Sequence, residues 1–382
     1  MPTLRPWLAA VVLFAAFTGL VVVAPVEAQQ AKDKAPELTN NKALAAKLEA
    51  IRTEHKLPAV WGAIVRDNEL LAVAAVGVRK DGDATPVTVN DQIHLGSDTK
   101  AMTATVIALL VEKKKLRWNS TIGEVFPNLK GKVHDDYLGV TVTQLLGHQA
   151  GLPANSAWGR TPPKKTNREY RRELLPTILK DAPADKPGTK FSYSNSGYVV
   201  AGAMAEEASG ESWEDLMTKT LFKPLGMAKA GFGAPGAPGK VDQPWGHRLA
   251  NDKLIASQTD NPPVMGPAGT AHAPLADWAK FATLHLDGAR GKGTLLKPET
   301  FKHLHTPLDG SIYACGWGTG RNGVLAHDGS NTMWYARVTL FPRDNVAYLI
   351  GINQGGDEAR KACDKAHKAV NDFFLAEFAN KK

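Results

Sequence analysis

Hydrophobic residues recur at two spacings along the chain, one typical of strands and one typical of helices. Near both ends, apolar runs bounded by turn residues predict β-strands, and Asp67-Asn68 between the first two runs fits a hairpin turn. Residues 357–378 carry apolar residues every four positions and predict a long amphipathic helix, and a second is predicted for residues 38–55. The predicted strands are residues 59–65, 70–78, 313–321, 324–327, 334–341 and 346–353.

The middle of the chain has helical spacing interrupted by loops, including a Gly- and Pro-rich loop at residues 231–239. The predicted helices are residues 101–111, 144–147, 168–179, 196–207, 211–221 and 277–286. Strands at both ends with helices between them predict one sheet built from both chain ends, with a helical part inserted. Within one domain of residues 29–380, we expect residues 29–100 and 290–380 to form the α/β part and residues 101–289 the mostly helical part.

The first 28 residues are predicted to be a signal peptide rather than part of the fold. Arg5 precedes a near-continuous apolar run over residues 7–23, and Val26-Glu27-Ala28 has the small-x-small pattern of a cleavage site. Cleavage after Ala28 predicts export to the periplasm or the extracellular space, with no stable membrane anchor. The alternative is an uncleaved anchor, because the apolar run approaches the about 20 residues that span a bilayer.

The composition is that of an ordinary globular protein, with 43% hydrophobic and 22% charged residues. It excludes disordered, collagen-like and coiled-coil chains. The net charge of +8 raises the question of nucleic-acid binding, but the lysines are scattered and have no aromatic platform among them. Together with the predicted export, this pattern favours a solvated basic surface, and we expect no nucleic-acid partner.

Cysteine and histidine usage argues against a metal centre. The two cysteines, Cys315 and Cys363, exclude a disulfide-rich scaffold and any four-cysteine metal site. In an exported protein they could pair, and two buried free thiols are the alternative. His303 and His305 are interpreted as exposed histidines near a helix end, and the sequence has no H-E-x-x-H or Walker motif. We expect no metal and no cofactor.

Ser97 and Lys100 form an S-x-x-K element at the start of the apolar helix predicted for residues 101–111. Side chains three positions apart share one face of a helix, so Lys100 would point toward the Ser97 hydroxyl. An apolar environment destabilises the lysine ammonium, which would let Lys100 act as the base that activates a serine nucleophile. Alone the pattern is weak, because a helix cap followed by a surface lysine gives the same letters.

A second element, Tyr193 and Asn195, lies in a polar loop just before a predicted helix. A tyrosine there can relay a proton to a leaving group, and an asparagine can bind a substrate amide. The alternative is an ordinary helix cap.

A third element, His327-Asp328-Gly329-Ser330, ends a short predicted strand. A glycine in that place would let a substrate lie close to the strand backbone. The backbone N–H of Ser330 could then pair with that of Ser97 as an oxyanion hole. Standing alone, this element would be an ordinary strand-ending turn.

In order and spacing, the three motifs resemble those of the serine β-lactamase and penicillin-binding-protein group. The Tyr-x-Asn form resembles the class C-like branch, which also holds D-stereospecific aminopeptidases, DD-carboxypeptidases, esterases and amidases. Residues 144–153 resemble the group's L-L-x-H-x-S-G-L segment, and residues 266–270 and 277–281 its glycine turn and D-L-A-x-F helix. The resemblance spans roughly residues 40–380. It implies a β-lactamase/transpeptidase-like fold, an antiparallel sheet flanked by helices with an inserted all-helical domain.

Two positions depart from the group's pattern. His327 stands where β-lactamases usually carry lysine, and histidine is less suited to a lasting pair with a substrate carboxylate because it is mostly neutral near pH 7. Esterase-like and peptidase-like members of the group often have histidine there. Ala150 replaces the usual serine of the H-x-S-G-L segment, at a position that looks structural.

The resemblance implies a secreted serine hydrolase that cleaves an amide or ester bond through an acyl-enzyme on Ser97. Lys100 and Tyr193 would share the proton transfers, and which of them is the base stays open because coupled groups titrate as a unit. Peptidase, amidase or esterase activity fits His327 better than β-lactamase activity does.

The resemblance also implies which residues bind substrate: Asn195 and His327 would position it, beside Gly329 and Ser330. The expected partners are small molecules or peptides with an amide or ester bond, including cell-wall fragments. The alternative function is a non-catalytic penicillin-binding-protein-like module that binds cell-wall peptide or a protein partner.

Overall fold

The computed structural model describes residues 38–159 and 161–379. The predicted signal peptide, residues 1–28, lies outside the described residues. In the described part of the chain, no helix combines the length and the apolar character needed to cross a membrane.

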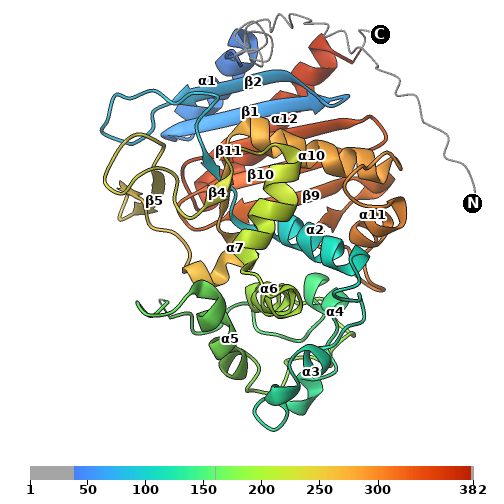
Figure 1. The fold of residues 1–382 in the computed structure, drawn as a ribbon. Coiled ribbons are helices and arrows are strands. Elements are labelled where there is room, and N and C mark those ends of the chain that lie inside the picture. Colours follow the sequence, from blue (N-terminus) through green and yellow to red (C-terminus); the bar gives the residue numbers. More distant parts are fainter. Residues whose placement is uncertain (1–37, 160, 380–382) are drawn as a thin grey trace, which may run out of the picture. The chain divides into compact units, whose positions relative to one another are not determined.

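A six-stranded antiparallel sheet in the order β2-β1-β11-β10-β9-β8 is the centre of the fold (Figure 1). Two of its strands come from the N-terminal end of the chain and four from the C-terminal end, and β1 pairs along its length with β11. The prediction of one sheet built from both chain ends is confirmed. The strands are β1 (Ala59–Arg66), β2 (Glu69–Gly77), β8 (Gly318–Thr319), β9 (Leu325–Ser330), β10 (Tyr335–Phe341) and β11 (Val346–Ile352).

The central strands of this sheet are buried on both faces, which is why they read as near-continuous apolar runs. In β1, Val60 and Ile64 belong to the core that includes α1 (Lys42–Glu54) and α12 (Asp357–Glu377). Trp61 and Ala63 belong to the core on the other face, where α10 (Leu275–Ala289) packs. The sheet therefore lies between two layers of helices.

The two cysteines lie in different cores. Cys363, on α12, belongs to the core with α1, whereas Cys315 belongs to the core on the opposite face of the sheet. Both are buried free thiols. Because the sheet separates them, the free-thiol alternative is confirmed and the disulfide alternative is wrong.

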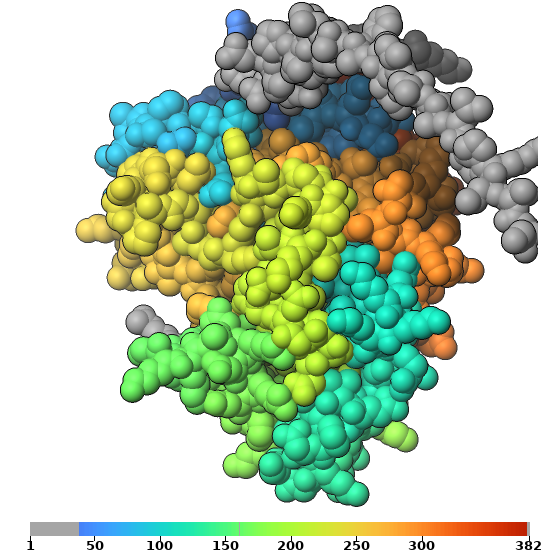
Figure 2. Space-filling view, in the orientation of Figure 1, coloured from blue at the N-terminus to red at the C-terminus, as the bar shows by residue number. Residues whose placement is uncertain are grey.

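The middle of the chain forms the helices that pack beyond the sheet. Two of them, α2 (Thr99–Glu112) and α6 (Asn195–Ser209), are buried over most of their length, and α2 packs against α6. In the space-filling view, the teal and green segments, which belong to residues 100–200, lie next to each other in the lower part of the picture (Figure 2). The other α-helices here are α3 (Ile122–Val125), α4 (Val142–Leu146), α5 (Asn167–Ile178), α7 (Trp213–Leu216), α8 (Lys223–Leu225) and α9 (Gly266–Gly269), and a π-helical turn (Met217–Phe222) lies between α7 and α8.

Some elements differ from the sequence prediction. Residues 313–321, expected to be a strand, contain only the two-residue β8, because Gly316 has a φ of +82° and turns the chain. Helix α10 falls within the range assigned to the helical part, yet it packs on β1 and β11. Elements that the sequence did not indicate are α11 (Pro298–His305) and the hairpin of β5 (Gly246–Ala250) and β6 (Lys253–Ser257).

A second small sheet, in the order β3-β7-β4, sets the position of the chain just before Ser97. Its strands are β3 (Ile93–His94), β4 (Gly231–Phe232) and β7 (Ala271–Ala273). After β3, the backbone N–H of Leu95 still donates to the carbonyl of Ala271 at 2.9 Å. Ser97 is therefore held three residues beyond the end of β3 and two beyond the fixed backbone of Leu95.

Candidate active site

Ser97 lies in a 3₁₀ turn, Gly96–Asp98, that runs directly into α2. This turn is pressed against the end of β9. A Cβ on Gly96 would lie 2.3 Å from the backbone nitrogen of Ser330, and Gly96 itself has a φ of +51°. Only glycine can occupy this position, because it needs both the left-handed backbone and the missing side chain.

Gly329 meets the same turn from the β9 side. A Cβ on Gly329 would lie 1.9 Å from the carbonyl oxygen of Leu95 and 3.0 Å from the backbone nitrogen of Ser97. The space beside Gly329, predicted from the sequence to admit a substrate, is filled on its Cβ side by the backbone of Leu95. The contact places the backbone nitrogens of Ser97 and Ser330 on adjacent segments, as the predicted oxyanion hole requires.

Lys100 reaches back along the first turn of α2 to Ser97, as the S-x-x-K spacing predicts. Its Nζ lies 3.0 Å from Ser97 Oγ, 2.7 Å from Asn195 Oδ1 and 2.7 Å from the carbonyl oxygen of Ala268. The side chain is fully buried, and burial lowers the pKa of Lys100 well below its ordinary value, although the charge of Asp98 opposes this. A neutral amine here could accept the Ser97 hydroxyl proton.

Tyr193 lies against the same pair. Its hydroxyl is hydrogen-bonded to Ser97, and Lys100 Nζ sits 4.8 Å from the centre of its ring. Burial raises the pKa of Tyr193 above its ordinary value, and the hydrogen bond to Ser97 offsets only part of this. The phenol therefore keeps its proton at neutral pH.

Asn195 is the first residue of α6, which is capped by the Ser194 hydroxyl. Its Oδ1 accepts from Lys100, and its Nδ2 donates to Asn155 Oδ1 at 2.9 Å. The structure thus brings Asn195 into the site as a partner of Lys100, a contact that the sequence analysis did not anticipate.

His327 is buried, and both of its ring nitrogens face protein atoms. Nε2 lies 2.8 Å from the Tyr313 hydroxyl, and Nδ1 lies 2.8 Å from the carbonyl oxygen of Asp328 and 3.3 Å from Asp98 Oδ1. Two acceptors face Nδ1, so the ring proton belongs there and Nε2 accepts from Tyr313. Burial, with the nearby Lys100, lowers the pKa of His327 to about 4, so the ring is neutral near pH 7.

Asp98 is a site residue that the sequence analysis missed. It directly follows Ser97 in the sequence and is fully buried. Neither of its carboxyl oxygens has a hydrogen bond to any described residue. Burial, followed by the charge of Asp328, raises the pKa of Asp98 well above its ordinary value. An acidic residue in the first turn of a helix is common, so its letter alone gave no signal.

An aromatic cluster forms the wall behind Tyr193 and was also missed, apart from His148 in the segment quoted for the resemblance. The ring of His148 packs against Tyr193 at 4.3 Å and against Tyr313 at 4.7 Å between ring centres. Its Nδ1 accepts from the backbone nitrogen of Ser194 at 3.1 Å. A cavity of about 650 Å³ opens beside this wall and is lined by Tyr193, Tyr313, Val324, Ala326 and His327, among others.

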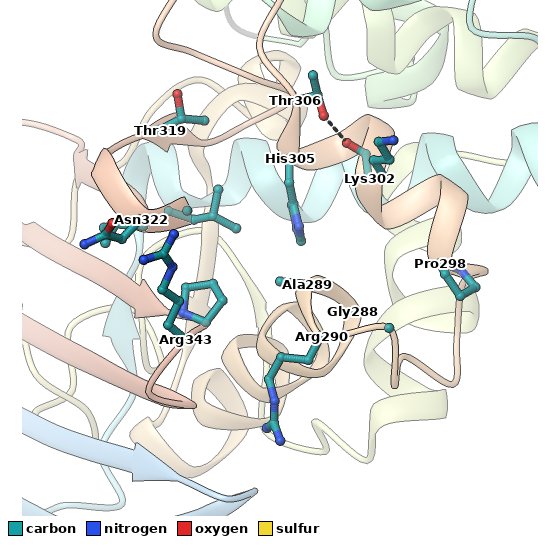
Figure 3. Close-up of a pocket in the computed structure, with 15 residues that line it drawn as sticks. Gly288, Ala289, Arg290, Pro298, Lys302, His305, Thr306, Thr319, Asn322 and Arg343 are labelled. Carbon is teal, nitrogen blue, oxygen red and sulfur yellow. Dashed lines mark hydrogen bonds between the residues drawn. The ribbon is translucent and has the colours of Figure 1, made fainter. Parts of the chain in front are cut away.

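A second hollow, of about 640 Å³, lies beside α11 (Figure 3). Arg290 and Lys302 line it, but their side chains point in different directions, so they do not converge on a ligand (Figure 3). His305 turns inward, with Nε2 2.9 Å from His285 Nδ1, and burial lowers its pKa to about 4. His303 stacks on Trp118 at 4.0 Å between ring centres.

The interpretation of His303 and His305 as exposed residues is therefore wrong, because neighbouring rings cover them. Neither joins a metal site: among residues 38–159 and 161–379, no group of three or more His, Cys, Asp or Glu side chains is placed to hold a metal ion.

Comparisons of the sequence with known proteins identify a family and several relatives. The Beta-lactamase family model matches residues 44–371. Penicillin-binding protein 4 of Amycolatopsis lactamdurans is 28% identical over 337 residues, which cover 81% of this chain and 84% of that protein.

Solved structures show the same fold. The class C β-lactamase from Rhodobacter sphaeroides superposes with a TM-score of 0.68 at 19% identity, covering 88% of this chain and 100% of that one. The D-amino acid amidase from Ochrobactrum anthropi superposes with a TM-score of 0.69 at 21% identity, covering 87% of this chain and 99% of that one. The predicted β-lactamase/transpeptidase-like fold is confirmed.

Proposed function

Because the chain belongs to the Beta-lactamase family, we propose that it is a serine hydrolase that cleaves an amide or ester bond through an acyl-enzyme on Ser97. One observation carries the proposal: the amine of the fully buried Lys100 lies 3.0 Å from the Ser97 hydroxyl. A buried lysine has lost the hydration that favours its charged form, and an adjacent neutral base can activate a hydroxyl as a nucleophile.

Acylation follows from the protonation states of the three groups. The neutral Lys100 amine takes the Ser97 proton while Oγ forms a bond to the substrate carbonyl carbon. The Tyr193 phenol, which keeps its proton, donates it to the leaving nitrogen or oxygen as the amide or ester bond breaks, and Lys100 then returns a proton to Tyr193. In this proposal Lys100 is the base and Tyr193 is the acid, two roles that the sequence left open.

The negative charge of the tetrahedral intermediate forms on the former carbonyl oxygen. The backbone N–H groups of Ser97 and Ser330 would donate to it from the two adjoining segments. A water molecule, activated by the same base, then attacks the acyl carbon and releases the acid product from Ser97. Hydrolysis is complete without a metal or a cofactor.

The structure favours amidase, peptidase or esterase activity over β-lactamase activity within this proposal. His327 is uncharged and both of its nitrogens face protein partners, so it offers no lasting cationic partner to a substrate carboxylate. The named relatives, a penicillin-binding protein and a D-amino acid amidase, support a substrate with an amide bond. Cell-wall fragments are proposed as one source of such substrates.

A substrate panel tests the proposal directly. Purified protein is assayed with p-nitrophenyl esters, D-amino acid amides, D-alanyl peptides and nitrocefin, alongside Ser97→Ala as the matched variant without the nucleophile. We expect turnover of at least one ester or amide and its loss in Ser97→Ala. No turnover of any compound by the wild-type protein, with binding to cell-wall peptide retained, would instead support the non-catalytic module.

Export is a separate proposal that rests on the sequence of residues 1–28. N-terminal sequencing of the protein from the periplasm or the medium should begin at Gln29. An intact Met1 in the membrane fraction would instead identify an uncleaved anchor.

A further inference from the structure

Asp260 lies between β6 and α9 and joins two segments that the proposed mechanism needs. Its side chain is about one-tenth exposed, and its Oδ1 lies 2.8 Å from His94 Nε2 and 2.8 Å from Asn331 Nδ2. The backbone N–H of Asn261 donates to the same oxygen at 2.6 Å. One carboxylate oxygen is therefore in contact with His94, with Asn331 and with the neighbouring Asn261.

The first contact leads to the nucleophile turn. His94 ends β3, and its Nδ1 accepts from the backbone N–H of Gly96 at 3.1 Å, directly before Ser97. Nδ1 therefore has no proton, and the ring proton is on Nε2, facing Asp260. This N–H is not aligned as in an ideal hydrogen bond, so the attraction is that between the N–H dipole of a neutral ring and the charged carboxylate at 2.8 Å.

The second contact leads to the other oxyanion donor. Asn331 follows Ser330 directly, and its Oδ1 accepts from the backbone N–H of Met333 at 3.1 Å. Between them, Thr332 has a φ of +73°, an unfavourable conformation for a β-branched residue that must be held by its surroundings. The amide of Asn331 bridges this turn to Asp260.

Asp260 keeps its charge in this setting. Burial alone would raise the pKa of Asp260, but the contact with His94 and the hydrogen bonds from Asn331 and Asn261 hold its pKa below the ordinary value. A charged carboxylate attracts donors more strongly than a neutral acid does. The carboxylate can therefore hold both His94 and Asn331 in place.

We propose that Asp260 is a positioning residue that fixes the separation of the two oxyanion donors, acting on Ser97 through His94 and on Ser330 through Asn331. The inference rests on the proposed function and adds a residue to it. The two backbones already meet at Gly96 and Gly329, so packing limits how closely they approach. The Asp260 contacts limit how far they can separate.

The expected effect is on the transition state. The oxyanion exists only during bond making and breaking, so looser donors should lower kcat and leave KM for an ester substrate nearly unchanged. Losing one oxyanion donor outright costs about 100- to 1,000-fold in kcat. Loosening a donor without removing it should cost less, and we expect a fall in kcat of about 10- to 100-fold in Asp260→Asn.

The experiment compares Asp260→Asn and Asn331→Ala with Asp277→Asn. Asp277, on α10, is a matched buried carboxylate that is 7% exposed. It accepts a hydrogen bond from the Lys229 backbone N–H at 2.7 Å. Active sites are counted by titration with a fluorophosphonate, so that kcat refers to folded protein only. The same reagent supplies a second readout, because its tetrahedral adduct also needs the oxyanion donors.

The outcomes separate the two proposals. Support requires that both site variants lose kcat at constant KM and react more slowly with the fluorophosphonate, while Asp277→Asn matches the wild type. The double variant should lose no more than the stronger single one, because both act through one connection. Unchanged kcat per titrated site in Asp260→Asn and Asn331→Ala would overturn the inference, whereas an inactive wild type would overturn the proposed function itself. Asn331→Ala keeps the test valid if Asp260→Asn does not fold.

Discussion

Gly329→Ala tests whether backbone contact between the nucleophile turn and β9 sets the geometry of the site. The new Cβ would lie 1.9 Å from the Leu95 carbonyl oxygen, whereas real Cβ contacts are essentially never closer than 3.0 Å. The neighbouring backbone must therefore move by about 1.1 Å. Gly329 does not need a positive φ, so the perturbation is steric and not conformational.

The displaced atoms belong to the segment that carries Ser97, so the cost should appear in the rate. A misplacement of about 1 Å at reacting groups costs about 100-fold in rate, equivalent to about 2.7 kcal/mol of activation free energy. We expect kcat of Gly329→Ala to fall by about that factor.

The assay measures kcat per titrated active site with a p-nitrophenyl ester, and circular dichroism records the folded fraction. Gly139→Ala is the matched control, because a Cβ there meets no atom within 4 Å and Gly139 has no positive φ. The control should keep wild-type activity. Gly329→Ala with kcat within twofold of the wild type would refute the reasoning.

Three further predictions follow from the same structure. Lys100 should lose its proton at a pH below its ordinary pKa, so kcat/KM should rise with pH through the lowered pKa of Lys100. The unfolded chain keeps that proton up to the ordinary pKa, so the free energy of unfolding should also rise with pH between the lowered and the ordinary pKa. Urea titrations should show this pH dependence in the wild type and not in Lys100→Met. A thiol reagent should modify no cysteine in the native protein and two in denaturant without reductant, since Cys315 and Cys363 are buried and free; no thiol in denaturant would contradict this. Leu48→Ala, in the core below α1, should lower the free energy of unfolding by about 2–5 kcal/mol and leave kcat per active site unchanged, as measured by denaturant unfolding and ester hydrolysis.

The elements that local sequence determines could be predicted. The hairpin turn at Asp67 and Asn68 has positive φ values of 51° and 68°, the geometry that a tight hairpin requires and that these residues tolerate. The contact of Ser97 with Lys100 follows from helical spacing alone. Such features depend on residues only a few positions apart, so the local sequence is enough to predict them.

The contacts that the sequence missed join distant parts of the chain. Lys100 is bound by the backbone carbonyl of Ala268, a group that every residue has and that no letter reveals. Tyr313 reaches His327 because Gly316 turns a segment that read as a strand. Asp260 lies in a loop, and its partners His94 and Asn331 are far from it in sequence, so their contact appears only in the folded structure.

The central claim is that Ser97 is the nucleophile of an acyl-enzyme. Mass spectrometry of the protein after reaction with a fluorophosphonate or a penicillin measures it most directly, with peptide mapping to locate the adduct. The account predicts one adduct per chain, on Ser97, and none in Ser97→Ala. An adduct on another serine, or one that persists in Ser97→Ala, would contradict it.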